Sequence, residues 1–393
     1  MASTHLLLAF LACFSFAYGA HPDIGLSPLE LITKYGYPLE RHWVTTEDGY
    51  ILNMHRIPHG LKNADEPNKP PVLIMHGLLS SGADFVSLGP EKAIGFLLAD
   101  LGYDVWLGNA RGTTYSRNHT TLNPDEKDFW MFSWHEIGYY DIAAKVDYIL
   151  EKNGQDKVFY IGHSQGTTVS YVLLADRPEY NDKMRLVVSL GPAAYMSSMI
   201  NIFFKVAAMV LDDLVTIIEG LGWYELLSYN ETMSHTITEL CAEGADYQEI
   251  CASLLFMICG YNLPQVNYTT LPVLMSNVPA GISYRQLIHY GQEINSKRFT
   301  HYDFGAEQNL EIYGQEDTPD YDISAITAPV ALFYSDNDWI CDTKDVEQLH
   351  SELPNPALLH KNEDERFNHV DFMWANDIVP LLNVHIIDIM SKY

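Results

Sequence analysis

The chain has 393 residues, of which 47% are hydrophobic and 19% are charged, and its formal net charge is −28 at pH 7. This composition is typical of a globular protein with a sizeable core and excludes an intrinsically disordered chain. The acidic balance argues against nucleic acids and anionic membrane surfaces as partners, because both attract basic proteins.

The N-terminus has the pattern of a secretory signal peptide. Residues 1–19 contain no Asp, Glu, Lys or Arg, residues 6–17 are almost wholly apolar, and Ala17-Tyr18-Gly19 offers a small-x-small cleavage site. We expect cleavage after Gly19 or Ala20. A membrane anchor is the alternative, but the run is shorter than the ~20 residues that a span requires. The sequence therefore predicts a protein secreted outside the cell or into a gut lumen, with the lysosome as the second destination.

Three sequons and four cysteines fit this route. Asn118, Asn230 and Asn267 each begin an Asn-X-Thr acceptor pattern for N-glycosylation. The cysteines beyond the signal peptide are Cys241, Cys251, Cys259 and Cys341. No Cys-X-X-Cys or cysteine–histidine pattern among them predicts zinc. One disulfide is plausible in an oxidising compartment, and the spacing leaves both Cys241–Cys251 and Cys251–Cys259 open.

Short apolar runs alternate with helical patterns along the first half of the chain. The runs over residues 72–75, 103–107, 158–161 and 185–190 are typical of strands buried on both faces. Residues 136–152 carry the apolar stripe of a helix, and Gly154 follows as a stop signal. Strands that alternate with helices predict an α/β fold with a doubly wound, mostly parallel sheet.

The alternation of strands and helices stops after Gly191-Pro192 and returns at residues 328–334. Residues 358–360 give one more short strand, and residues 372–390 a C-terminal helix bent at Pro380. The intervening residues 193–321 are helical in pattern. We therefore predict an α/β core made of residues 20–192 and 322–393, interrupted by a helical cap over residues 193–321. Ligands bind beyond the carboxyl ends of the strands in such sheets, so an inserted cap would cover the site.

The early part of this cap is apolar on more than one helical face, from Met199 to Leu211. One interpretation is a lipid-contacting surface that is exposed at an oil–water interface. The other is cap core packed against the α/β domain. The sequence supports both about equally, and some residues can do both.

The pentapeptide Gly162-His163-Ser164-Gln165-Gly166 lies between the strand 158–161 and a helical run. A G-x-S-x-G turn between strand and helix is the context of a nucleophile elbow, which exposes the serine hydroxyl at a helix N-terminus. We interpret Ser164 as a catalytic nucleophile; the alternative is a loop serine between two glycines.

A serine nucleophile needs a base and an acid, which follow it in the order Ser, Asp or Glu, His on this fold. His369 lies just before the last helix, where a triad histidine is expected; the alternative is a surface-loop histidine. The acid should follow the strand 330–334, where Asp336, Asp338 and Asp342 are candidates, and position favours Asp338.

An oxyanion hole needs two backbone N–H donors. One is expected from Gln165, the residue after the nucleophile. The other is expected from the loop after the strand 72–75, where we assign Leu78.

Four segments together resemble the acid lipase family, which includes gastric, lingual and lysosomal acid lipases and many secreted insect lipases. They are His76-Gly77-Leu78-Leu79, residues 102–112, residues 162–168 and Asn368-His369-Val370-Asp371-Phe372. The resemblance extends from Leu31 to the C-terminus. It implies an α/β-hydrolase fold with a helical cap, part of which acts as a lid. It also implies the triad Ser164, Asp338 and His369, and oxyanion donors Leu78 and Gln165.

The resemblance adds three details. The Asn337-Asp338 pair matches the family pattern and favours Asp338 as the acid. The family's cap disulfide falls on Cys241 and Cys251, which leaves Cys259 free. No metal or organic cofactor is implied.

The expected activity is hydrolysis of fatty-acyl esters of neutral lipids at an oil–water or micelle interface, with triacylglycerol ahead of sterol esters. Another serine acyl hydrolase, such as a peptidase, thioesterase or carboxylesterase, is the first alternative, because the fold hosts these too. A non-catalytic lipid carrier on a lipase scaffold is the second, and it is disfavoured because all three triad candidates are present.

Overall fold

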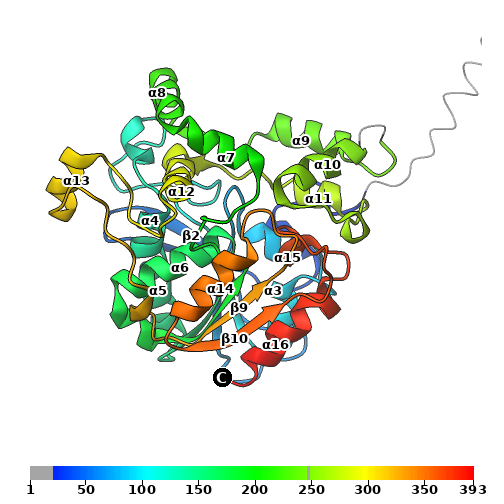
Figure 1. Cartoon of the computed structure of the whole chain (residues 1–393). Helices are drawn as coiled ribbons and strands as arrows, with labels where there is room; N and C mark the ends of the chain where they lie inside the picture. Colours follow the sequence, from blue (N-terminus) through cyan, green and yellow to red (C-terminus); the bar gives the residue numbers. More distant parts are fainter. Residues whose placement is uncertain (1–20, 246–247) are drawn as a thin grey trace, which may run out of the picture.

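The computed structural model describes residues 21–245 and 248–393, and Figure 1 shows how its elements are arranged. The signal peptide predicted over residues 1–19 lies outside the described residues. Among the described residues, no helix combines the length and apolarity needed to cross a membrane.

An eight-stranded sheet forms the centre of the molecule, in the order β1-β2-β4-β3-β5-β6-β9-β10. Its strands are β1 Glu40–Thr45, β2 Ile51–Ile57, β3 Pro71–Met75, β4 Asp104–Gly108, β5 Val158–His163, β6 Met184–Leu190, β9 Val330–Tyr334 and β10 Pro356–Lys361. The six strands from β4 to β10 are parallel, which confirms the predicted α/β class. β1 and β2 add an antiparallel edge that the sequence analysis did not predict.

Helices cover both faces of the sheet, so side chains that alternate along one strand enter two different cores. Leu73 of β3 packs in the cluster that includes residues of α5 (Ala143–Asn153) and α6 (Gln165–Asp176). Its neighbours Val72 and Ile74 pack in the opposite cluster with α3 (Ile94–Asp100) and α16 (Val384–Met390). This two-sided burial explains why the strands are continuous apolar runs in the sequence.

Two predicted helices differ from the structure. The helix expected over residues 136–152 is assembled from α4 (Trp134–Glu136), the π-helical η3 (Ile137–Ile142) and α5. Gly138 lets η3 lie against α6, because a Cβ there would come within 2.6 Å of Val172 Cβ.

The C-terminal helix expected over residues 372–390 is interrupted before Pro380. α15 (Asp371–Trp374) ends early, and η7 (Val379–Asn383) and α16 follow. The break occurs because the N–H groups of Asn376 and Asp377 bond to the backbone and side-chain oxygens of Gln265, both at 2.9 Å, instead of continuing a helix.

The residues between β6 and β9 contribute a group of helices, and α7 to α12 gather at the top of Figure 1. They are α7 Ile202–Met209, α8 Leu211–Leu221, α9 Glu231–Leu240, α10 Gln248–Cys259, α11 Leu271–Met275, α12 Tyr284–Ser296 and α13 Ala306–Tyr313. A disulfide joins Cys241 and Cys251, the pair implied by the family resemblance, while Cys259 and Cys341 are free and buried.

The three sequon asparagines differ in exposure. Asn118 and Asn230 are exposed, whereas Asn267 is half-buried. The Asn267 side chain accepts hydrogen bonds from the N–H groups of Thr269 and Thr270 and donates one to Asn376 Oδ1. Glycosylation at each remains a prediction, and Asn267 would have to release these contacts.

Candidate active site

Ser164 occupies a sharp turn between β5 and α6. Its backbone has φ +53° and ψ −120°, a conformation that L-residues rarely adopt and that stores strain at functional sites. The flanking glycines make this turn possible by close packing. A Cβ on Gly162 would lie 2.4 Å from the carbonyl oxygen of Gly166, and one on Gly166 would lie 2.4 Å from that of Met75. Any side chain at either position would therefore push the elbow apart.

His369 and Asp338 meet beyond the carboxyl ends of β10 and β9. His369 Nδ1 lies 2.7 Å from Asp338 Oδ2, and both residues are buried. The other carboxylate oxygen, Oδ1, accepts the N–H groups of Ile340 and Cys341, each at 2.9 Å. Because the carboxylate accepts the Nδ1 proton, the lone pair of a neutral His369 is on Nε2, the nitrogen that can act as a base.

The two other acid candidates have different partners. Asp336 forms an ion pair with Lys361 and accepts a hydrogen bond from Thr343 Oγ1 at 3.2 Å. Asp342 is the N-cap of α14 (Thr343–Glu352) and accepts the N–H of Lys344 at 2.9 Å. Of the three, Asp338 is the one that contacts His369.

The two oxyanion candidates present unused N–H groups beside Ser164. Gly77 approaches Ser164 so closely that a Cβ on it would lie 3.1 Å from Ser164 Cβ, and this places the next residue, Leu78, at the cavity. Gln165 is the first residue of α6, and its side chain is held by Gln286 at 2.6 Å. Within the described part of the chain, neither backbone N–H has a hydrogen-bond acceptor.

Ser164 and His369 line one cavity of about 340 Å³. The rest of its wall is almost wholly apolar and comes from both the core and the cap, including Leu78, Met199, Phe204, Leu214, Leu255 and Ile288. In this conformation Ser164 Oγ forms no hydrogen bond with any described residue. Catalytic contacts of this kind often tighten only when substrate is bound.

His163 precedes Ser164 and is hydrogen-bonded to the loop that carries His369. Its Nε2 donates to the carbonyl oxygen of His369 at 2.9 Å. Burial, and then the nearby His369 ring, lower the pKa of His163 to about 3, so the ring stays neutral. The neutral ring with its proton on Nε2 is therefore the form present well above pH 3. Sequence reasoning had not assigned this residue a role.

The loop that carries the oxyanion candidate Leu78 is hydrogen-bonded to residues 108–112, the last part of the segment 102–112 that resembles the family. The N–H of Ala110 donates to His76 Nε2 at 3.1 Å, so the ring proton is on Nδ1, which donates to the carbonyl oxygen of Gly77 at 2.8 Å. Burial lowers the pKa of His76 to about 4, which keeps this ring neutral.

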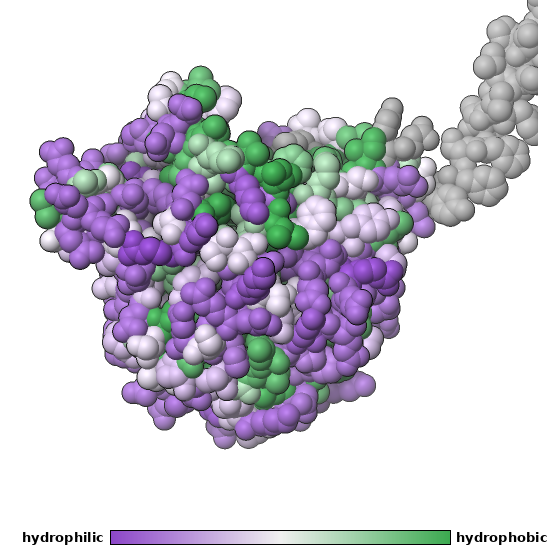
Figure 2. Space-filling view, in the orientation of Figure 1, coloured by the Kyte–Doolittle hydropathy of each residue, from purple (hydrophilic) through white to green (hydrophobic). Residues whose placement is uncertain are grey.

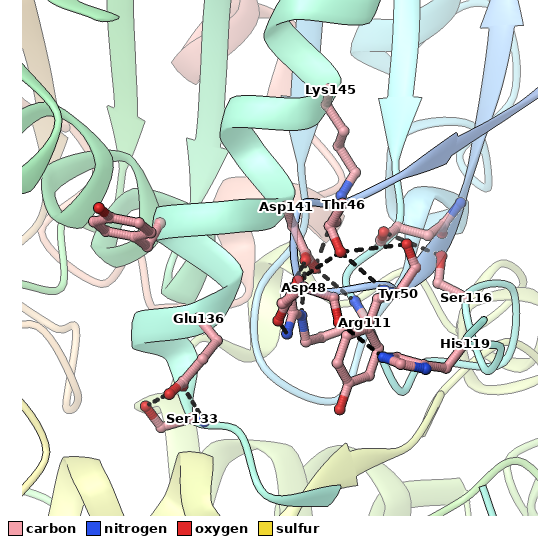
Figure 3. Close-up of polar contacts among 12 residues, drawn as sticks. Thr46, Asp48, Tyr50, Arg111, Ser116, His119, Ser133, Glu136, Asp141 and Lys145 are labelled. Carbon is pink, nitrogen blue, oxygen red and sulfur yellow. Dashed lines mark hydrogen bonds and ion pairs between the residues drawn. The ribbon is translucent and has the colours of Figure 1, made fainter. Parts of the chain in front are cut away.

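Arg111 anchors the same motif in a buried network of charges (Figure 3). Its guanidinium lies between Asp141, with Nε 2.7 Å from Oδ1, and Asp48, with Nη2 2.9 Å from Oδ1. The ring of Tyr50 stacks 3.9 Å from the guanidinium carbon. Lys145 Nζ lies 4.0 Å from Asp141, and burial lowers its pKa to about 8. Removal of one member would leave an uncompensated buried charge, which is strongly destabilising.

The end of α10 is hydrogen-bonded to the two loops that carry Asp338 and His369. The carbonyl oxygen of Cys259 accepts the N–H groups of His369, at 3.2 Å, and Trp339, at 3.4 Å. The following residues add side-chain hydrogen bonds, from Asn368 Nδ2 to Gly260 O (2.8 Å), Asn337 Nδ2 to Tyr261 O (3.0 Å) and Asn262 Nδ2 to Asp371 Oδ2 (2.7 Å). We call residues 259–262 the α10 anchor; no local pattern in the sequence indicates it.

Comparison with known proteins identifies the family. A model described as a partial alpha/beta-hydrolase lipase region matches residues 29–89, and one described as the alpha/beta hydrolase fold matches residues 70–216. Lipase 3 of Drosophila melanogaster is 43% identical over 93% of this chain and 92% of its own length.

The chain belongs to the acid lipase family.

Two further members of the acid lipase family are also similar over nearly the whole chain. Gastric triacylglycerol lipase of Bos taurus is 36% identical over 97% of this chain and 95% of its own length. Lysosomal acid lipase/cholesteryl ester hydrolase of Homo sapiens is 35% identical, with coverages of 95% and 92%. The predicted family is thus confirmed, and with it the class of enzyme, a carboxylic-ester hydrolase of the lipase type.

Solved structures agree on the fold. A Sulfolobus solfataricus protein that has been assigned as a lipase superposes with a TM-score of 0.60 at 16% identity, over 87% of this chain and 90% of its own. At this identity the match shows the α/β-hydrolase fold alone.

Proposed function

We propose that this acid lipase family member hydrolyses fatty-acyl esters of neutral lipids, triacylglycerol first, with Ser164, Asp338 and His369 as its triad. The observation that carries the proposal is the 2.7 Å contact between His369 Nδ1 and Asp338 Oδ2, behind a cavity wall that includes Ser164. A base held by a buried carboxylate beside a strained serine is the arrangement that acyl transfer needs.

The chemistry follows from these positions. His369 Nε2 takes the Ser164 proton as Oγ attacks the ester carbonyl carbon, and the Leu78 and Gln165 amides stabilise the oxyanion. The imidazolium, held by Asp338, protonates the departing alcohol. Water then attacks the acyl-enzyme by the same steps and releases the fatty acid. Each amide donor is expected to stabilise the transition state by about 3 kcal/mol.

The cavity supports a fatty-acyl chain as the group that is transferred. Its wall is apolar apart from the triad candidates and a few polar groups such as Ser80 and Asp84. The names of the relatives include both a triacylglycerol lipase and a cholesteryl ester hydrolase, at nearly equal identity. Sterol esters are therefore the second candidate substrate.

We further propose that α7 contacts the lipid surface. Phe204 of this helix faces the cavity, whereas Phe203 is 56% and Met209 81% exposed. Figure 2 shows hydrophobic side chains gathered around this helix, above a mostly hydrophilic lower part. The helix thus combines the two roles between which the sequence did not decide, since one face covers the cavity and the other is open to solvent.

We place the working enzyme in the extracellular space or a gut lumen, with the lysosome as the alternative. The support is the predicted signal peptide and the three sequons. Secretion from cells that express the full chain, followed by N-terminal sequencing of the medium, tests the route and the cleavage after Gly19 or Ala20.

A fluorophosphonate probe and a panel of esters test the activity. We expect labelling of Ser164 and turnover of triolein or cholesteryl oleate above that of acyl-CoA and peptide amides. Ser164→Ala and His369→Ala should abolish detectable hydrolysis without lowering the melting temperature. Absence of labelling in folded protein would favour the lipid carrier, and turnover of amides or thioesters alone would favour another acyl hydrolase.

A further inference from the structure

A second cluster of chemically active side chains lies outside the active site. It consists of His135 on α4, Asp176 at the end of α6 and His301 in the segment after α12, and one ligand atom from each lies within 4.8 Å of the others. All three side chains are partly buried, with exposures of 21%, 18% and 14%. Asp176 is eleven residues past Gln165, so the cluster lies about 16 Å along α6 from the nucleophile.

Asp176 is in an unusual place for a carboxylate. The C-terminal end of a helix carries partial negative charge, so an anion there is unfavourable unless a cation lies close. The neighbouring Arg177 does not supply it, because its guanidinium binds Glu47 and Glu179. Within the described residues, the ion-pair partners of Asp176 are the two histidines.

The polar contacts of the His301 ring also bear on the need for a positive charge beside Asp176. Its Nδ1 lies 3.1 Å from the carbonyl oxygen of Pro319, which can only accept a proton. Its Nε2 lies 2.8 Å from Asp176 Oδ2. In a neutral ring with the proton on Nδ1, two lone pairs would face each other across this short distance. The Pro319 oxygen also accepts the backbone N–H of His301 at 3.0 Å, so the ring can carry its proton on either nitrogen. Either a proton on Nε2 or a metal ion therefore lies between Nε2 and the carboxylate.

We propose that His135, Asp176 and His301 bind a divalent transition-metal ion, with zinc as the best match to their donors. Two imidazole nitrogens and one carboxylate oxygen are a common protein ligand set for zinc, with water in the fourth position. The bond from His301 Nδ1 to a backbone carbonyl is the outer contact that metal-binding histidines typically make.

The distances between the donor atoms are close to those around a zinc ion, and small side-chain shifts on binding would complete the site. Donor atoms around tetrahedral zinc are about 3.3 Å apart, given bonds of about 2.0–2.1 Å. Here Asp176 Oδ2 is 2.8 Å from His301 Nε2 and 4.0 Å from His135 Nδ1, so the two distances bracket that value. The Tyr321 hydroxyl lies 2.7 Å from His135 Nδ1, and the ion replaces this hydrogen bond.

Such an ion would join the end of the cap insertion to the core. His301 follows α12, a helix that lines the cavity with Leu287, Ile288 and Ile294. His135 and Asp176 belong to core helices. The ion thus fastens one wall of the cavity, and it takes no part in ester hydrolysis. No zinc motif is recognisable in the sequence because the three donors are far apart along the chain.

The test measures metal binding directly. The purified protein is treated with a chelator, desalted, and titrated with Zn²⁺ against a chromophoric chelator, and with Co²⁺ by visible absorbance, near neutral pH. We expect one equivalent of Zn²⁺ with micromolar or tighter affinity, a Co²⁺ spectrum of four-coordinate type, and a melting temperature that rises with added Zn²⁺.

Four variants locate the ion. Asp176→Asn and His301→Ala should each weaken binding at least ~10-fold. His235→Ala removes a histidine that is 73% exposed on α9 and should bind as the wild type does. His369→Ala removes the other possible ligand group, Asp338, Cys341 and His369, and should also retain the equivalent.

Two results would overturn the proposal. One is the absence of stoichiometric binding, which would leave a proton between His301 and Asp176. The other is binding that survives Asp176→Asn and His301→Ala but is lost in His369→Ala. If the cluster variants fail to fold, Co²⁺ titration of His369→Ala decides, because one equivalent with a four-coordinate spectrum supports the site and none overturns it.

Discussion

Both oxygens of the Asp338 carboxylate accept hydrogen bonds. Two backbone N–H groups donate to Oδ1 and the His369 ring donates to Oδ2, and Asp338 is 2% exposed. The two N–H groups hold the side chain in place even if its charge is removed. The contribution of the charge to the proposed triad can therefore be tested without loss of the fold.

Asp338→Asn should reduce kcat/KM by about 10³- to 10⁴-fold, because an amide nitrogen cannot accept the His369 Nδ1 proton and the ring adopts the wrong tautomer. Asp336→Asn is the matched control, since Asp336 pairs with Lys361 at the surface, and it should keep nearly wild-type activity. Kinetics on a soluble short-chain ester, with melting curves for both variants, would show this. Equal losses of activity in the two variants, or a larger loss in Asp336→Asn, would show that Asp338 is not the acid of the triad.

Asp84 introduces a titratable group into the cavity wall. Burial raises its pKa from 3.8 to about 6, although the Ser80 hydroxyl donates to it at 2.5 Å. The folded state thus holds this proton more tightly than the unfolded state does. The contribution of Asp84 to stability is fully present below pH 4 and is lost as the pH rises to about 6.

Asp84→Asn should remove this dependence, because an amide stays neutral. A shift of two pKa units corresponds to about 3 kcal/mol. The melting temperature of the variant, relative to wild type, should rise between about pH 4 and pH 6 and then level off. Thermal scans of both proteins across this range measure the difference, in which the other titrating groups cancel. Parallel curves would show that Asp84 is already ionised in the fold.

At the level of elements, α7 is a helix with two apolar faces. One face encloses the cavity through Phe204 and Ala208, and the other presents Ile202, Phe203 and Met209 to water. Exposed apolar surface of this extent costs solubility unless it has a binding role. We therefore propose the lipid surface as the partner of the exposed face.

The double variant Phe203→Ser/Met209→Ser should lower the rate on a triolein emulsion several-fold. It should leave a monomeric soluble ester and the melting temperature unchanged, because both side chains are largely exposed. Leu101→Ser is the control, since Leu101 is 55% exposed and follows α3, on the core. A loss on the soluble ester, or an equal loss in the control, would count against an interfacial role for α7.

For the whole molecule, the net charge of −28 is expected to oppose approach to anionic surfaces. The apolar contacts proposed for α7 would act at short range, whereas charge repulsion extends over a Debye length of about 10 Å at 0.1 M salt. On an uncharged droplet no charge repulsion opposes these apolar contacts, and we expect the enzyme to adsorb. On an anionic droplet the repulsion opposes them.

Salt should therefore activate the enzyme only on anionic substrates. Raising NaCl from about 10 mM to about 150 mM should increase the initial rate on triolein emulsified with an anionic phospholipid, because the longer-range repulsion is screened. The same change should have little effect with a zwitterionic phospholipid. Initial rates at constant droplet area compare the two, and an identical response would mean that the net charge does not control adsorption.

The features that were predictable from the sequence are those marked by patterns of neighbouring residues. Ser164 could be proposed as the nucleophile because the strand, the turn and the helix are contiguous. His369 and Asp338 could be proposed because each follows a recognisable strand, and the Asn337-Asp338 pair of the family favoured Asp338. The α10 anchor was missed because its contacts are remote, with Asn368 and Gly260 separated by 108 residues. The β1 and β2 strands were missed because β1 is largely exposed and lacks the apolar run of a central strand.

The α10 anchor has a consequence for the construction of chimaeras within this family. Exchange of caps between relatives is an obvious way to transfer substrate preference, and the junctions suggested by the chain are residues 193 and 321. Such a graft would also replace the carbonyl group of Cys259, which holds the backbone of His369. A chimaera should therefore keep residues 259–262 of the recipient chain. These residues lie within the cap insertion, but their hydrogen bonds hold the loops of Asp338 and His369.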